Sequence, residues 1–201
     1  MKVLYATFTV VIADQVSKFL VRGIQIPSLG ISYAGMPLYS SREILGNLIQ
    51  LTYVTNAGTA FGLGPGFTEV FAVFSLFASI AIFAYLYMIR NQGLGIRLSF
   101  ALILGGAIGN MLDRVFLGPI FDGAGLFSGR VIDFIDINFF HLPLVFNIAD
   151  AAVTIGVVML VFFQRRLAAG SPELELAGGG ETGISPQKGK TTDAEDPSNA
   201  A

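Results

Sequence analysis

Four long apolar stretches, separated by polar segments, dominate the hydrophobic pattern of the chain. They lie at about residues 3–22, 68–89, 97–116 and 146–164, and no charged residue interrupts the second between residues 70 and 89. Twenty helical residues extend over roughly 30 Å, the thickness of the hydrocarbon core of a bilayer. The pattern therefore predicts four transmembrane helices, with a short polar turn at residues 90–97 joining the second to the third.

Two long connections, residues 23–67 and 117–145, interrupt the helical pattern. Residues 48–54 in the first connection and 131–137 in the second are rich in β-branched residues, so each is predicted to form a strand. Residues 41–45 are predicted to form a short amphipathic helix at the membrane interface. The fold class predicted is a membrane all-α protein with four transmembrane helices, a small extracytoplasmic β-sheet and a short interfacial helix.

The last part of the chain has a different composition. Residues 168–201 consist mainly of small, polar and acidic residues without apolar periodicity, which is typical of a disordered segment. We therefore predict a membrane domain over residues 1–167 and a disordered cytoplasmic tail over 168–201. Short basic flanks at Lys2, Arg90, Arg97 and residues 165–166 place both termini in the cytoplasm by the positive-inside rule.

Composition excludes several kinds of site. The chain is 53% hydrophobic and only 13% charged, whereas soluble domains carry about 25% charged residues. The absence of cysteine excludes a thiol nucleophile, and a single histidine, His141, excludes metal sites built from several histidines. No basic patch with interleaved aromatic residues is present, so a nucleic-acid partner is not expected.

Polar residues within three of the apolar stretches fall at one depth. Counted from the basic cytoplasmic ends at 1.5 Å per residue, Asp14 lies at roughly 18 Å, Asn110 at roughly 20 Å, Asp150 at roughly 22 Å and Asp113 at roughly 24 Å. This coincidence predicts one polar site in the outer half of the bilayer, close to the surface on which the two long connections lie.

Two carboxylates are the candidate catalytic groups of that site. Asp150 lies in the first turn of the fourth apolar stretch, where hydrocarbon cannot solvate a charge, and Asp133 lies just upstream. Neighbouring carboxylates share a proton, so that one can activate a water while the other polarises a carbonyl. Side chains alternate along a strand, so Asp133 and Asp136 face opposite ways and only one is expected in the site. The alternative for Asp150 is a charge stabilised by the helix dipole.

The remaining polar residues have more than one possible role. Asp14 and Lys18, four residues apart, are interpreted as a structural ion pair, and serine–lysine catalysis by Ser17 and Lys18 is disfavoured because adjacent helical residues diverge by about 100°. Arg114 can neutralise Asp113 or hold a substrate carbonyl. Asn147 can cap the helix that follows it or belong to the site. Asn56 can form a turn or belong to the site.

Five short motifs occur in order along the chain: Asp14-Gln15-x-x-Lys18, Asn56-x-Gly58-x-Ala60-Phe61, Gly105-Gly106-Ala107-x-Gly109-Asn110-x-x-Asp113-Arg114, Val131-x-Asp133-Phe134 and Phe146-Asn147-x-Ala149-Asp150. Together they resemble the bacterial lipoprotein signal peptidases (signal peptidase II) over about residues 1–166. The interval after Arg114 is longer than in that family, with an insertion at residues 118–129, and the tail lies outside the resemblance.

The resemblance implies a membrane aspartic endopeptidase that removes signal peptides from diacylglyceryl-modified prolipoproteins by cleaving before the lipidated cysteine. It implies Asp133 and Asp150 as the catalytic pair. Residues that bind substrate or support the site would be Asp14, Lys18, Asn56, Gly58, Asn110, Asp113, Arg114 and Asn147. The family lies in the bacterial inner membrane, with the site facing outward, and is the target of globomycin. We expect a monomer that needs neither metal nor cofactor and that contacts its prolipoprotein substrate and membrane lipids.

Other functions remain as alternatives. A small proton-coupled membrane transporter would relay protons through Asp14, Asp113 and Asp150. A non-enzymatic membrane assembly factor would present the small face formed by Gly105 and Gly109 to a partner helix. For a peptidase, we hypothesise that the substrate pairs in an extended form with the strand at residues 48–54.

Overall fold

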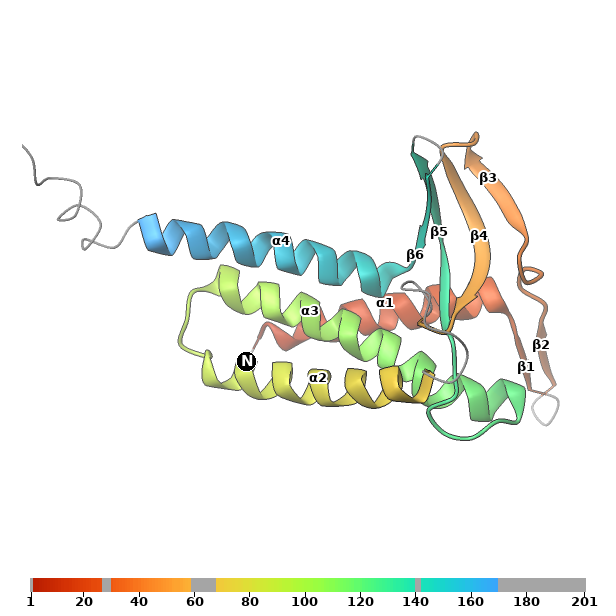
Figure 1. Ribbon diagram of the computed structural model, residues 1–201, viewed down its shortest axis with the longest axis horizontal. Helices are drawn as coiled ribbons and strands as arrows, with labels where there is room; N and C mark the ends of the chain where they lie inside the picture. The colour runs from red at the N-terminus through yellow and green to blue at the C-terminus, as the bar shows by residue number, and fades with distance from the viewer. Residues whose placement is uncertain (1, 27–29, 59–67, 140–141, 170–201) are drawn as a thin grey trace, which may run out of the picture. The chain divides into compact units, whose positions relative to one another are not determined.

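The computed structural model describes residues 2–26, 30–58, 68–139 and 142–169. Its four long helices are α1 (Leu4–Arg22), α2 (Thr68–Met88), α3 (Leu94–Leu112) and α4 (Ile148–Ala169). Each is long and apolar enough to cross a membrane. They lie side by side and alternate in direction, with the strands gathered at one end (Figure 1). The tail predicted to be disordered lies outside the described residues from 170 onward.

The helix surfaces divide into a packed side and a side suited to lipid. Phe74 and Phe77 of α2 are 69% and 65% exposed, as expected for side chains that face hydrocarbon rather than protein. A buried cluster of apolar residues joins α2 and α3 to the start of α1, and its buried members are Val3, which directly precedes α1, Leu86, Ala101 and Leu104. The bundle therefore buries only a narrow apolar seam.

Glycines in α3 allow the helices to approach closely. A Cβ atom at Gly106 would overlap the carbonyl oxygen of Ala149 in α4, and one at Gly105 would lie 2.8 Å from the Cβ of Val10 in α1. Small residues at such positions are a common basis of helix packing in membranes. Gly109 lies close to Asp14 of α1, as Gly105 does to Val10, so α1 of the same chain occupies the small face predicted from Gly105 and Gly109.

The third span continues beyond α3 as a π-helix, η3 (Asp113–Asp122). The span was predicted to end at about residue 116, with a connection from residue 117. That prediction was wrong, because the wider π-helical turn accommodates Pro119, which has no N–H to donate. The segment ends at Asp122 and is followed by Gly123, whose φ of 63° is left-handed.

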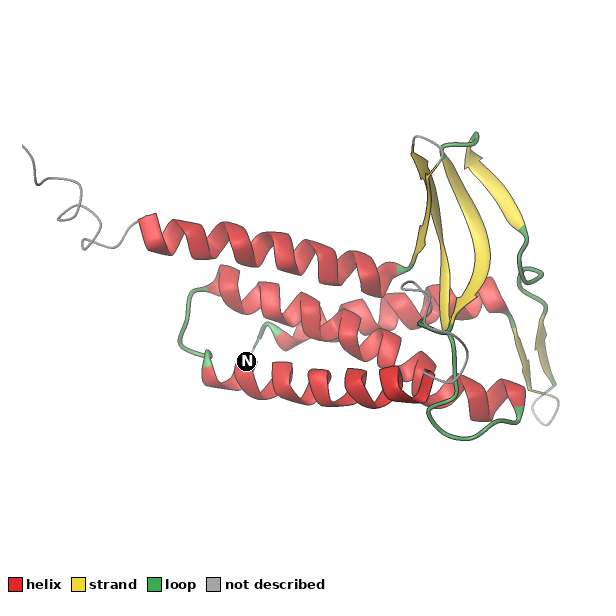
Figure 2. Ribbon diagram, in the orientation of Figure 1, coloured by secondary structure: helices red, strands yellow, loops and turns green. Residues whose placement is uncertain are grey.

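The strands form two antiparallel sheets. A hairpin pairs β1 (Ile24–Ile26) with β2 (Ile31–Tyr33), and four strands follow in the order β3 (Ser41–Leu45), β4 (Ile49–Asn56), β5 (Val131–Phe139) and β6 (Leu142–Phe146). The sheets stand at one end of the helices (Figure 2). The strands predicted at 48–54 and 131–137 correspond to β4 and β5.

Two sequence-based interpretations of this region were wrong. Residues Ser41–Leu45 form β3 rather than an interfacial helix, because pairing with β4 satisfies their backbone groups. β4 is paired on both sides, by β3 and β5, so it has no free edge for a substrate peptide. The edges of this sheet are β3 and β6.

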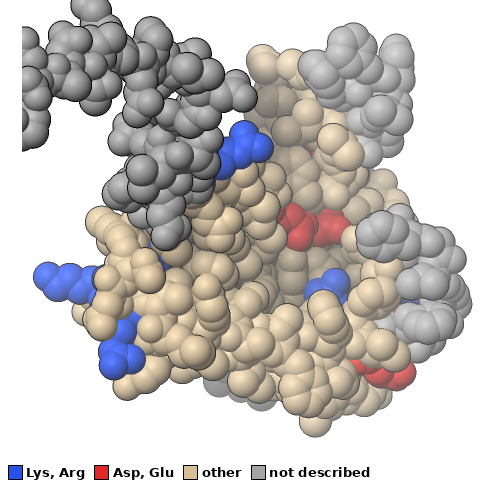
Figure 3. Space-filling model, turned by 60° about the vertical axis from the view of Figure 1, so that its left-hand side comes forward, with Lys and Arg blue, Asp and Glu red and all other residues tan. Residues whose placement is uncertain are grey.

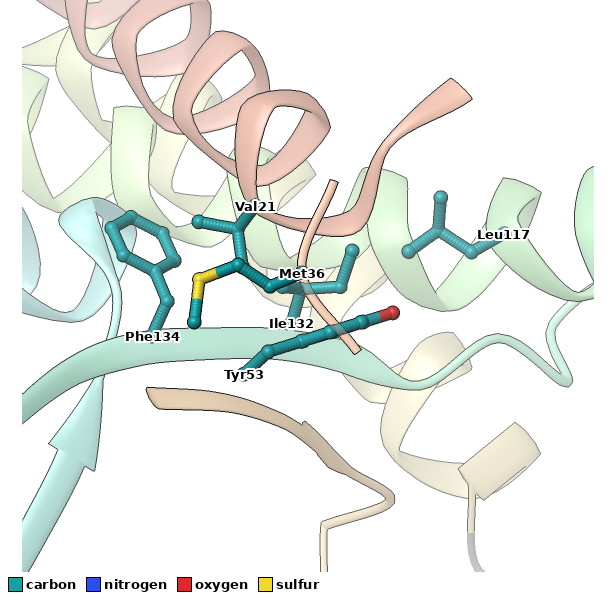
Figure 4. Packing of buried hydrophobic residues seen from close by; sticks show 6 residues of the cluster. All are labelled: Val21, Met36, Tyr53, Leu117, Ile132 and Phe134. Carbon is teal, nitrogen blue, oxygen red and sulfur yellow. The ribbon is translucent and has the colours of Figure 1, made fainter. Parts of the chain in front are cut away.

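An apolar cluster attaches the sheet to the helices. Its buried members come from α1, η3, β4, β5 and the segment before β3, and they are Val21, Met36, Tyr53, Leu117, Ile132 and Phe134 (Figure 4). Burying a side chain of this size stabilises a fold by about 1.5–3 kcal/mol. The cluster therefore holds β5, and with it Asp133, against the ends of α1 and η3.

Candidate active site

Asp133 and Asp150 both accept hydrogen bonds from Asn147. Asp133 lies on β5 and is 3% exposed, and Asp150 lies in the first turn of α4. The Nδ2 of Asn147 donates to Asp133 Oδ1 at 2.6 Å, and the backbone N–H of Asn147 donates to Asp150 Oδ2 at 3.3 Å. A single residue at the junction of β6 and α4 thus binds both carboxylates.

Asn147 is a helix cap and a site residue at once. Its Oδ1 accepts the backbone N–H of Asp150 at 2.9 Å, which together with the reverse bond forms a reciprocal cap at the start of α4. The helix predicted to begin at about residue 146 therefore begins at Ile148, after Phe146 has ended β6. Since the cap occupies Oδ1, Nδ2 is the atom that faces Asp133.

Asn56 combines a turn and a site contact in the same way. The Oδ1 of Asn56 accepts the backbone N–H of Gly58 at 2.8 Å, and its Nδ2 donates to Asp133 Oδ2 at 3.2 Å. Gly58 has a φ of +91°, and a Cβ atom there would lie 2.5 Å from the ring of Phe71. The turn therefore requires glycine for both its conformation and its space.

Asn110 of α3 connects Asp150 to a buried ammonium. Its Nδ2 donates to Asp150 Oδ1 at 2.7 Å, whereas its Oδ1 accepts from Lys18 Nζ at 3.0 Å and from Asn147 Nδ2 at 3.1 Å. An ammonium has donors only, so it fixes which end of the amide faces it. Asn110 is thereby held as a donor toward Asp150.

Three buried charges lie beneath the two carboxylates. Lys18 is 2% exposed and binds Asp14 Oδ2 at 2.7 Å and Asp113 Oδ2 at 2.8 Å. With Asn110 as the third acceptor, all three ammonium hydrogens are used. This arrangement confirms the predicted Asp14–Lys18 ion pair and adds Asp113 to it.

The two acids of this triad also bind the backbone beside the candidate catalytic residues. Asp14 Oδ1 accepts the N–H of Ala149 at 3.0 Å, and Asp113 Oδ2 accepts the N–H of Ile132 at 3.1 Å. Ala149 directly precedes Asp150, and Ile132 directly precedes Asp133. The triad therefore anchors both chain segments that present the carboxylates.

Gln15 is a further residue of this network, and no site role was predicted for it from the sequence. Its Nε2 lies 3.0 Å from Asp113 Oδ1, 3.2 Å from Asp14 Oδ2 and 3.1 Å from the carbonyl oxygen of Gly109. Gln15 thus donates to both acids that flank Lys18. Its position beside Asp14, within a motif already recognised, was the available signal.

Lys18 rather than Arg114 forms the salt bridge to Asp113, although Arg114 lies within electrostatic range of that carboxylate. The NH1 group of Arg114 donates to the carbonyl oxygen of Asn110 at 3.3 Å, and its Nε is buried without a hydrogen-bond partner among the described residues. Arg114 also lies within electrostatic range of Asp133 and Asp150. A buried donor that lacks an acceptor is costly, so this group is suited to a bound carbonyl.

The environment of Asp133 favours its protonated form. Burial raises its pKa from 3.8 to about 6, and the charge of Asp150 acts in the same direction. The hydrogen bonds from Asn56 and Asn147 oppose this rise. An acid with a pKa near neutrality can both hold and release a proton during a reaction.

Asp136 lies outside the site, as the alternation along the strand predicted. Its Oδ2 accepts the hydroxyl of Thr52 on β4 at 2.8 Å, and that hydroxyl lies 2.9 Å from the hydroxyl of Ser41. These contacts lie toward β3, whereas Asp133 is bound by Asn56 and Asn147. Of the two acids on β5, only Asp133 joins Asp150.

An apolar cavity of about 470 Å³ adjoins Asp150. Residues of β6 and of the first two turns of α4 line it, namely Leu144, Val145, Phe146, Asp150, Ala151, Thr154 and Ile155. Figure 3 shows acidic and basic side chains within a hollow of a face that is otherwise largely uncharged. The site therefore combines a polar floor with an apolar wall beside one carboxylate.

Comparison with known proteins identifies relatives over nearly the whole membrane domain. The model of a family described as signal peptidase (SPase) II matches residues 6–165. A lipoprotein signal peptidase of Moorella thermoacetica is 37% identical over 171 residues, which cover 85% of this chain and 96% of that protein. One from Chlorobium phaeobacteroides is 36% identical over 65% of this chain and 81% of its own length.

A solved structure supports the same relationship at the level of the fold. It is described as a bacterial membrane enzyme, is 28% identical in sequence and superimposes with a TM-score of 0.64. The match covers 81% of this chain and 92% of that one.

Proposed function

The chain belongs to the signal peptidase II family and is a membrane peptidase that removes signal peptides from prolipoproteins, and we propose that it does so by aspartic catalysis with Asp133 and Asp150. The observation that carries this proposal is the binding of both carboxylates by Asn147, through its side chain and its backbone. Two carboxylates held together in this way interact strongly enough to share one proton.

In the proposed reaction Asp150 is ionised and Asp133 carries the shared proton, consistent with its raised pKa. Asp150 removes a proton from a water, whose oxygen attacks the carbonyl carbon of the scissile peptide bond. Asp133 donates its proton to the carbonyl oxygen as the tetrahedral intermediate forms. The intermediate collapses when Asp133 takes that proton back and Asp150 protonates the leaving amine, which breaks the C–N bond.

The remaining predicted residues have supporting roles in this proposal. Arg114 offers its buried Nε to a substrate carbonyl. Asn56, Asn110 and Asn147 orient the carboxylates, and Gly58 permits the turn that orients Asn56. Asp14, Lys18 and Asp113 hold the segments on which the pair lies.

We place the apolar part of the substrate in the cavity between β6 and α4. The cavity is lined on one side by Asp150, and most of its other lining residues, between Leu144 and Ile155, are apolar. β6 is an edge strand, so its outer side is the one available to an extended peptide beside the carboxylates. The substrate class that fits is a lipid-modified prolipoprotein, in agreement with the sequence-based expectation.

The proposed orientation puts the sheets and the site on the outer side of the bacterial inner membrane. The opposite end of the bundle contains the start of α1 and the turn between α2 and α3, flanked by Lys2, Arg90 and Arg97 (Figure 1). Such basic flanks mark the cytoplasmic side. Both termini would then be cytoplasmic, and the enzyme would act as a monomer that globomycin inhibits.

The transporter alternative is not favoured. A proton relay needs carboxylates that can change partner, but Asp14 and Asp113 are both bound by Lys18 and by backbone N–H groups. The relatives with high coverage are peptidases.

Cleavage of a lipid-modified prolipoprotein by the purified chain tests the proposal. Asp133→Asn and Asp150→Asn should each lower the rate by at least about 10²-fold, since each removes a group that transfers a proton. Asp136→Asn is the matched control, because it makes the same change on the same strand outside the site. Full cleavage by either Asp133→Asn or Asp150→Asn, with Asp136→Asn also active, would refute the aspartic pair.

A further inference from the structure

A second cavity, of about 430 Å³, lies apart from the catalytic pair and is basic. Two arginines from different elements line it: Arg22, the last residue of α1, and Arg130, which directly precedes β5. Three hydroxyl-bearing side chains also line it, from Tyr53, Thr55 and Ser128. The Ser128 hydroxyl already donates to the carbonyl oxygen of Gly125. The described lining thus combines two guanidinium groups with the hydroxyl of Thr55 and contains no carboxylate, a set of groups that suits an anion.

The cavity lies at the level where two spans end. Arg22 ends the first apolar span and Phe121 ends the third, and the guanidinium of Arg22 stacks over the ring of Phe121 with 3.8 Å from its carbon to the ring centre. Stacking fixes the plane of the guanidinium. The cavity is therefore at the depth at which lipid phosphates lie beside a membrane protein.

The second arginine and the hydroxyl of Thr55 complete a site for a phosphate. Arg130 is solvent-exposed and forms no salt bridge within the described part of the chain. Thr55 pairs with Ile132 across β4 and β5, so the cavity borders the same strand pair that carries Asn56 and Asp133. A ligand bound by Arg22 and Arg130 would join the end of α1 to the start of β5.

We propose that this cavity binds the phosphate of an anionic membrane phospholipid. Basic pockets at the ends of transmembrane helices are suited to such headgroups, because a bilayer supplies them at high local concentration and arginine binds phosphate in a bidentate manner. Leu38 and Ala124 give the cavity an apolar part that accommodates the glycerol and the first carbons of the lipid. This site does not depend on the assignment of the catalytic pair.

The test uses the full chain in nanodiscs made of phosphatidylcholine, with and without phosphatidylglycerol. The readouts are the Tm and the retention of phosphatidylglycerol measured by native mass spectrometry. Phosphatidylglycerol should raise the Tm of the parent, and Arg130→Gln should retain this lipid with an affinity on the order of tenfold lower, since a charge-assisted contact is lost. Arg22→Gln should have the same effect.

Arg42→Gln is the matched control, because Arg42 is an exposed arginine of β3 that does not line the cavity. It should retain phosphatidylglycerol like the parent. Arg130 is exposed, so its replacement tests the site even where Arg22→Gln fails to fold. Equal loss of retention in Arg42→Gln would show a general effect of surface charge and overturn the proposal. An equal Tm rise with inorganic phosphate in pure phosphatidylcholine would also overturn it, in favour of a site for free phosphate.

Discussion

At the scale of single residues, the site depends on the orientation of three asparagine amides. In each, the oxygen is bound by a donor that cannot act as an acceptor: the N–H of Gly58 for Asn56, the N–H of Asp150 for Asn147 and the ammonium of Lys18 for Asn110. Each amide nitrogen is consequently left to face a carboxylate. Three neutral donors thereby position the two acids without adding charge to a buried site.

The raised pKa of Asp133 predicts a dependence of stability on pH. The folded protein binds this proton more tightly than the unfolded chain, so the associated stability is fully present below the ordinary pKa of 3.8 and is lost as the pH rises through about 6. The loss is at most about 3 kcal/mol. Thermal unfolding across this range should show a falling Tm for the parent and for Asp136→Asn. Asp133→Asn should lack this component, and an unchanged profile would contradict the assignment.

The buried triad predicts a large effect of removing Lys18. Lys18→Met leaves Asp14 and Asp113 buried without their ammonium partner, so we expect destabilisation by about 3–5 kcal/mol. Lys2→Met is the control, since Lys2 is exposed and its replacement should change stability by less than about 0.5 kcal/mol. The Tm of both variants in detergent measures the difference. Similar Tm values for the two variants would show that the triad contributes little.

At the scale of elements, the close packing of α3 brings the polar side chains together. Gly105 and Gly109 face α1, and Gly106 faces α4, so the backbone of α3 lies close to both helices that carry site residues. This spacing lets Asn110 reach Lys18 on one side and Asp150 on the other. Longer side chains at these glycines would move the donors away from the carboxylates.

Gly106→Ala tests this dependence on helix spacing. The added methyl group would overlap the carbonyl oxygen of Ala149, which is backbone and cannot rotate away, so we expect a cost of about 1–3 kcal/mol and a lower cleavage rate. Gly93→Ala is the matched control at the start of α3, because a Cβ atom there has nothing within 4 Å. Tm and prolipoprotein cleavage are the measurements. An unchanged rate in Gly106→Ala would show that α3 can shift without harm to the site.

At the scale of the whole molecule, all the strands stand at one end of the four spans, and the site lies where they join the helices (Figure 2). In the part of the chain that the structure describes, the opposite end contains helix ends and a short turn. A polar site at one end of a membrane bundle can receive a substrate anchored in one leaflet. The orientation of the bundle therefore decides which leaflet supplies the substrate.

Cysteine labelling tests the proposed orientation, and the absence of natural cysteine makes the background clean. Glu43→Cys places a thiol on exposed β3, and Asn91→Cys places one in the exposed turn between α2 and α3. A membrane-impermeant maleimide should label Glu43→Cys in intact spheroplasts and Asn91→Cys only after permeabilisation, because basic flanks are retained in the cytoplasm. The reverse pattern would invert the proposed topology.

The sequence alone predicted the four spans, two of the strands and, apart from Gln15, the polar residues that the structure brings together. Membrane helices can be predicted from sequence because hydrocarbon requires each span to be long and apolar. A polar residue within a span is therefore easily identified. The same contrast predicted the common depth of Asp14, Asn110, Asp113 and Asp150, whose side chains the structure joins through Lys18 and shared hydrogen bonds.

Only the tertiary structure decided the roles within that set. It showed that Lys18 rather than Arg114 binds Asp113, that Asn147 and Asn56 each act as both turn or cap and site donor, and that Gln15 belongs to the network. It also showed β3 in place of an interfacial helix and α3 continued as η3. The contacts of Lys18 and Gln15 with Asp113, and that of Asn56 with Asp133, join segments far apart along the chain, and local patterns carry no information about such partners.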